Sequence, residues 1–100
     1  MNYEERIKEC LQIISEYGKW GEMLAGQSIS QICSGNSPFS ASVIHNGLKC
    51  IQAKMKLNVL YENNHTEKEK EKRLKQIDVD IQCLEEIMKH DLEYRRLLIL

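Results

Sequence analysis

Residues 66–88 read TEKEKEKRLKQIDVDIQCLEEIM, and this stretch decides the fold class of the chain. Thr66 is followed three residues later by Glu69, which is the capping-box pattern of a helix start. Apolar residues then recur at steps of three and four, the spacing of one helical face, at Leu74, Ile77, Ile81, Leu84 and Met88. The stretch therefore predicts a helix over residues 67–90.

Two earlier segments carry the same helical periodicity. The apolar face of residues 3–25 contains Ile7, Cys10, Leu11, Ile14 and Tyr17, continued by Trp20, Met23 and Leu24. The apolar face of residues 41–62 contains Val43, Ile44, Leu48, Ile51, Met55, Val59 and Leu60. Both segments are predicted to be helices. The polar residues 26–40 between them are predicted to be a loop, which is long for so small a domain.

The order of these segments predicts an all-α fold in a single domain, residues 1–100. Only a short polar connection separates the second helix from the third, so the two are expected to form an antiparallel helical hairpin with the first helix laid across it. His90 and Asp91 look like a joint, because Asp91 can cap a further short helix over residues 91–99. The expected architecture is a small three- to four-helix bundle.

Charge and cysteine spacing exclude several classes of protein. The chain has 14 Lys and Arg against 15 Asp and Glu, and it lacks the positive excess from which nucleic-acid-binding proteins gain affinity for phosphate. The four cysteines form no CxxC or CxxH pair, so neither a zinc site nor a redox motif is indicated. No signal peptide or membrane-spanning apolar stretch is seen, which predicts a cytoplasmic protein with reduced thiols.

No catalytic, cofactor-binding or metal-binding residue is predicted. His45, His65 and His90 lie in three separate segments, and none has an obvious carboxylate or thiol partner at a local spacing. The glycines near the end of the first helix follow no strand, so they do not form a phosphate-binding loop. The chain is therefore expected not to be an enzyme.

Two sets of residues are candidates for contacts with a partner. The EKEKEKR run is interpreted as a solvated helix start because its alternating charges cancel. A local basic face is a second interpretation, and its residues are Lys49, Lys54, Lys56, Arg73 and Lys75. Trp20 is either a core residue, which we favour, or the anchor of a protein interface.

The C-terminal sequence Leu97-Leu98-Ile99-Leu100 is dense in apolar residues for the end of a chain. Exposed to water it would form an aggregation-prone patch, so it is expected to fold back on the core, to associate with a second copy, or to pack on a continuation of the chain. We predict a homodimer through Leu97, Leu98 and Leu100.

Two stretches of the chain resemble antitermination proteins of lambdoid phages, of the Q type related to phage twenty-one. They are residues 13–32, IISEYGKWGEMLAGQSISQI, and residues 77–100, IDVDIQCLEEIMKHDLEYRRLLIL. The first stretch is similar to the N-terminal helix of that family, and the second to the helix before its helix-turn-helix. The recognition helix itself has no counterpart before Leu100. The resemblance implies a phage transcription regulator that contacts RNA polymerase or DNA.

Three functions follow from these observations. The first is a phage-encoded regulator of host transcription that binds RNA polymerase or DNA. The second is a phage inhibitor that blocks a bacterial defence protein or another host enzyme. The third is a small helical chaperone or adaptor. All three imply a protein partner, and the charge balance disfavours nucleic acid for the chain as a whole.

Overall fold

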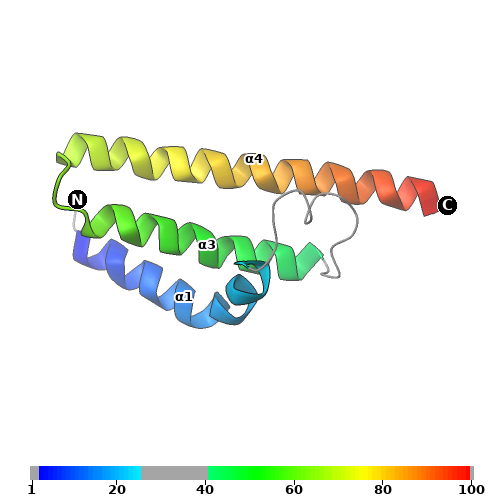
Figure 1. Ribbon diagram of the computed structural model, residues 1–100, viewed down its shortest axis with the longest axis horizontal. Coiled ribbons are helices and arrows are strands. Elements are labelled where there is room, and N and C mark those ends of the chain that lie inside the picture. Colours follow the sequence, from blue (N-terminus) through cyan, green and yellow to red (C-terminus); the bar gives the residue numbers. More distant parts are fainter. Residues whose placement is uncertain (1–2, 26–40, 100) are drawn as a thin grey trace.

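The computed structural model describes the backbone of residues 3–25 and 41–99 and the side chains of residues 3–25 and 42–87. Within these ranges the chain forms three helices and no strand: α1 (Tyr3–Ala25), α3 (Ala41–Tyr61) and α4 (Glu67–Ile99) (Figure 1). The predicted all-α class is confirmed. The loop predicted over residues 26–40 lies outside the described residues.

The predicted joint at His90 and Asp91 is wrong, because α4 continues without interruption to Ile99. No Gly or Pro occurs between residues 67 and 99, and an aspartate within a helix costs less than about 0.7 kcal/mol relative to alanine. Nothing in the backbone therefore ends the helix at this point. Residues 91–99 form the last turns of α4 instead of a separate helix. With 33 residues, α4 is about 50 Å long and extends well past α3 (Figure 1).

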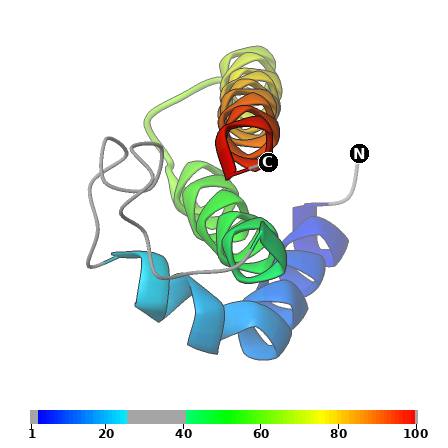
Figure 2. The ribbon, with the colours of Figure 1, turned by 90° about the vertical axis from the view of Figure 1, so that its right-hand side faces the viewer.

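The helix α3 lies between α1 and α4, as the view along the molecule shows (Figure 2). It contacts both of them. The backbones of α1 and α4 stay farther apart, and these helices are bridged by side chains near the start of α1. There Arg6 forms an ion pair with Glu71, and Lys70 Nζ lies 5.5 Å from the ring centroid of Tyr3.

The core occupies both sides of α3. Three residues of the apolar seam predicted in α4, Leu74, Ile77 and Ile81, are buried. The remaining buried hydrophobic residues come from α1 and α3, and they are Cys10, Leu24, Ile44, Leu48, Cys50, Ala53, Val59 and Leu60. Because α3 contributes most of this set, the middle helix is the element around which the other two are packed.

The close packing of α1 on α3 depends on two glycines. A Cβ atom placed on Gly21 would lie 2.5 Å from Cys50 Sγ and 2.8 Å from Cys50 Cβ. A Cβ atom placed on Gly47 would overlap the side chain of Leu24 and lie 2.9 Å from the carbonyl oxygen of Trp20. Carbon atoms that are not bonded prefer separations of about 3.5–4.0 Å. The two helices therefore approach at a distance that only glycine allows.

Alanine substitutions at the three helical glycines are expected to have opposite effects. Gly21→Ala and Gly47→Ala should each lower the free energy of unfolding by about 1–3 kcal/mol, because the new methyl group overpacks the contact between α1 and α3. Gly18→Ala should raise it by up to about 1 kcal/mol, since Gly18 has open space around it and alanine favours a helix. Urea unfolding followed by circular dichroism measures all three. Equal stability of Gly47→Ala and Gly18→Ala would contradict the close contact.

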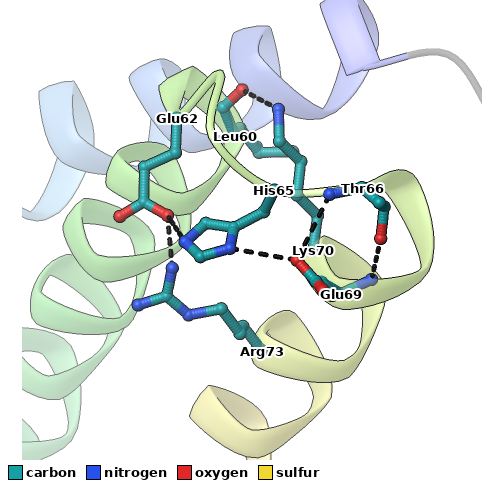
Figure 3. A network of polar contacts seen from close by, with 7 residues as sticks. All are labelled: Leu60, Glu62, His65, Thr66, Glu69, Lys70 and Arg73. Atoms are coloured by element: carbon teal, nitrogen blue, oxygen red, sulfur yellow. Dashed lines mark hydrogen bonds and ion pairs between the residues drawn. The ribbon is translucent and has the colours of Figure 1, made fainter.

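The connection between α3 and α4 is held by a network of polar contacts (Figure 3). Thr66 and Glu69 form the predicted capping box: Thr66 N donates to Glu69 Oε2 at 3.4 Å, and Glu69 N donates to Thr66 Oγ1 at 3.3 Å. His65 lies between two carboxylates, with Nε2 3.3 Å from Glu62 Oε2 and Nδ1 3.1 Å from Glu69 Oε2. The expectation that His65 has no carboxylate partner at a local spacing is therefore wrong. These contacts determine where α4 begins.

Two cations of α4 complete this network by contacting the last turn of α3 and the residue that follows it. Arg73 forms an ion pair with Glu62, and Lys70 Nζ donates to the carbonyl oxygen of Leu60 at 3.4 Å (Figure 3). Carbonyl groups in the last turn of a helix have no partner within the helix, so Lys70 satisfies one of them. Farther along, His45 Nδ1 lies 3.1 Å from Glu85 Oε1 and links the same two helices.

The capping box gives a second stability prediction. Thr66→Ala should lower the free energy of unfolding by about 1 kcal/mol because it removes the acceptor for the Glu69 N–H group. Thr66→Ser keeps a hydroxyl group at the same position and should leave stability within a few tenths of a kcal/mol of the parent chain. The same urea titration compares the two variants, and equal losses from both would argue against the cap.

Candidate binding groove

An open groove runs along α3 between α1 and the first turns of α4, with a volume of about 350 Å³. Its lining residues on α1 and on α3 follow one another mostly at steps of three and four, so on each helix they share the face that borders the groove. Its floor is apolar and consists of Cys10, Ile13, Ala53, Leu60 and Leu74. Its rim is polar and consists of Arg6, Glu9, Glu16, Tyr17, Lys49, Gln52 and Lys56. This size is at the lower end for ligand pockets, and it suits a few inserted apolar side chains.

Each cation on the rim of the groove is engaged within the fold. Lys56 Nζ lies 2.6 Å from Asp78 Oδ1, which also accepts a hydrogen bond from Gln52 Nε2 at 2.6 Å. Lys49 Nζ lies 5.2 Å from the ring centroid of Tyr17, within range of a cation–π contact. The third cation, Arg6, is paired with Glu71 of α4, as described above. Two of the three cations on the rim, Arg6 and Lys56, are therefore paired with carboxylates of the protein itself, whereas Lys49, among the described residues, is not.

The two carboxylates on the α1 side of the rim are in a different position. Glu9 and Glu16 are exposed, and neither forms an ion pair within the described residues. Glu16 Oε1 accepts a hydrogen bond from the neutral side chain of Gln12 at 3.2 Å. The open edge of the groove therefore carries two carboxylates that form no ion pair among the described residues, beside an apolar floor.

The buried thiol in the floor of the groove is kept in its neutral form. Burial raises the pKa of Cys10 above its ordinary value, and the nearby cations Lys56 and Arg6 oppose this effect more weakly. A neutral thiol is a poor nucleophile and a poor metal ligand. Within the part of the chain that the structure describes, no three His, Cys, Asp or Glu residues are grouped to hold a metal ion. The groove is therefore suited to binding rather than to thiol chemistry.

The raised pKa of Cys10 predicts a loss of stability in alkaline solution. In the unfolded chain the thiol loses its proton near its ordinary pKa of 9.0, while the folded protein still holds it. The unfolded state then binds fewer protons, so the free energy of unfolding falls as pH rises through this value. We expect a lower free energy of unfolding at about pH 9.5 than at about pH 7.5, measured by urea titration.

The Cys10→Ala variant should show a smaller fall between these two pH values than the parent chain. Cys83→Ala serves as the matched control because Cys83 is exposed, and it should keep the fall of the parent chain. An identical fall in Cys10→Ala and in the parent chain would show that the Cys10 thiol is not responsible.

The residues predicted to form a basic face are not gathered on one surface. Lys49 and Lys56 both line the groove, seven residues apart on α3. Lys54 is exposed and lies about 200° around the helix from Lys56. Arg73 lines a second groove on the α3–α4 surface, where it pairs with Glu62, and Lys75 is exposed on α4. The structure thus brings together two of the five lysine and arginine residues.

Trp20, which is also predicted to contact a partner, does not line the groove. Trp20 is half-buried, with its ring centroid 5.9 Å from that of Tyr17, and it is not part of the buried core. Leu97 and Leu98 belong to the last turns of α4, but their side chains and Leu100 lie outside the described residues. The homodimer expected from these leucines stays a prediction.

The residues that distinguish the groove were not selected by sequence reasoning. Glu9 and Glu16 are seven residues apart on one helical face, and that spacing is visible in the sequence. Their lack of a cation partner depends on where α3 and α4 place their lysines, which no local pattern reports. Gly47 was missed for the same reason, since its role requires knowing which residues of α1 lie against it.

Comparison with known proteins adds no family or fold relative: no protein-family model, no curated protein and no solved structure matches the chain. The resemblance to Q-type antitermination proteins therefore stays an expectation that rests on residues 13–32 and 77–100. Among the described residues, no helix combines the length and the apolar character needed to cross a membrane.

Proposed function

We propose that the chain is a regulatory binding protein that acts by docking on another protein and that carries no catalytic activity of its own. The observation that supports this most is the internal pairing of three cations that line the two grooves. Arg6, Lys56 and Arg73 each form an ion pair with a carboxylate of the same chain. A protein that binds nucleic acid uses such residues to neutralise phosphates instead. The apolar floor of the groove supplies the kind of surface that protein partners bury.

The proposed setting is regulation of host transcription by a phage-encoded protein, which is what the antitermination resemblance implies. In this proposal the partner is RNA polymerase, and DNA is not bound directly. The antiparallel hairpin of α3 and α4 is the platform, because it holds α4 in place along one side of the groove. The proposal places the protein in the bacterial cytoplasm, where polymerase is found.

The proposal is tested with the immobilised chain and two purified ligands, bacterial RNA polymerase and random-sequence duplex DNA. We expect polymerase to be retained at about 0.15 M salt, where surface charges are screened beyond about 8 Å, and DNA to flow through. Soluble chain added as competitor should release the polymerase, which controls for adsorption to the matrix. Retention of DNA without polymerase would contradict the proposal, and so would the loss of both.

A further inference from the structure

We propose that the groove along α3 receives a cationic amphipathic helix of the partner protein, one with an apolar stripe flanked by Lys or Arg. This inference rests on the proposed function as a protein-binding module, and it specifies the chemistry of the segment that is bound. It follows from the shape of the groove and from the charge on its rim.

The shape of the groove suits a helix better than an extended peptide or a compact ligand. The outer helices α1 and α4 flank α3 (Figure 2). Side chains bridge them near the start of α1, where Arg6 forms an ion pair with Glu71. An extended peptide is recognised mainly through the edge of a sheet, and the described chain has no strand. A helix laid along α3 would cover the apolar floor, in the way that an amphipathic helix binds a groove between helices.

The charge on the rim of the groove favours a bound segment that is positively charged. Lys56 is paired with Asp78. Lys49 lies against the neutral ring of Tyr17 and keeps its charge, so this one cation faces the two carboxylates Glu9 and Glu16, which leaves an excess of one negative charge. Glu9 and Glu16 remain available to a ligand. They are seven residues apart on α1, which places them about 10.5 Å apart along the helix axis. Lys or Arg side chains two turns apart on one flank of a bound helix would match this spacing.

The same features argue against other occupants. A nucleic acid would bring phosphates against Glu9 and Glu16, which repel them. A small polar ligand needs buried polar groups that converge on it, whereas Cys10, Ile13, Ala53, Leu60 and Leu74 make the floor apolar. A second copy of the chain is a distinct alternative, and the experiment below distinguishes it.

The probe is a synthetic amphipathic helix of about four turns, with leucines along one stripe and lysines two turns apart on its flank. Its binding to the full chain is measured by fluorescence anisotropy of a label on the peptide. A matched peptide has every lysine replaced by glutamate. The groove variant is Glu9→Gln with Glu16→Gln, and the control variant is Glu5→Gln with Glu22→Gln, which makes the same change of charge on α1 at positions that do not line the groove.

We expect the lysine peptide to bind the parent chain and the control variant alike, and to bind the groove variant about 5- to 10-fold more weakly, the effect of losing two exposed ion pairs. The difference should shrink at high salt, and the glutamate peptide should not bind. Equal binding of both peptides would overturn the inference, as would equal affinity for both variants. Circular dichroism verifies that the variants are folded.

Two further results separate this inference from its alternatives. Sedimentation of the chain at the assay concentration shows whether a second copy fills the groove, and a dimer that the lysine peptide cannot displace would overturn the inference. Polymerase retention is measured independently of the peptide. Retention of polymerase without peptide binding removes the helix-in-groove inference alone, whereas peptide binding without polymerase retention removes the transcription proposal alone.

Discussion

The close packing of α1 against α3 sets the arrangement of the other contacts in the described chain. At Gly21 and Gly47 the two helices are separated by less than the space that a methyl group needs. Leu24 and Cys50, the side chains that occupy this space, are almost completely buried, with exposures of 1% and 0%. Packing at this density makes the contact intolerant of added volume. It fixes the position of α1 along α3, and with it the register of every other contact between these helices.

The groove is a consequence of this arrangement. Because α1 is held tightly against one side of α3 while α4 packs on another, the outer helices meet only through side chains such as Arg6 and Glu71. The apolar residues between them are then covered incompletely. The polar network at the α3–α4 connection, which includes Glu62 and Arg73, keeps α4 in its place. The close contact between α1 and α3 and the polar network at the α3–α4 connection therefore leave a groove with an apolar floor and with carboxylates on one edge.

The helices could be predicted from the sequence because their signals are local. The capping box of α4 and the extent of α1 follow from spacing within one element, and the structure agrees with them. Of the seam predicted in α4, Leu74, Ile77 and Ile81 are buried. The joint at His90 and Asp91 was a misreading, since an aspartate that is able to cap a helix does not end one in the absence of Gly or Pro. Aspartate is a common N-cap residue, but Asp91 lies inside α4, where no helix begins.

The groove was not predictable in the same way. Whether Lys56 is free or bonded to Asp78 depends on the register between α3 and α4, and residues 22 positions apart in sequence carry no local sign of their contact. The role of Gly47 could not be predicted either, because a glycine within a helical pattern indicates only a loss of helix stability of about 1 kcal/mol relative to alanine. Gly47 is needed because Leu24 and the Trp20 carbonyl oxygen of α1 lie against it, and this contact is seen only in the folded chain.

Nuclear Overhauser spectroscopy of the isotopically labelled chain detects the contact between α1 and α3. We expect strong cross-peaks from the Gly47 Hα protons to the Leu24 methyl groups and from the Gly21 Hα protons to the Cys50 Hβ protons. A well-dispersed helical spectrum without these cross-peaks would show that the helices pack in another register, and the groove described above would then not exist.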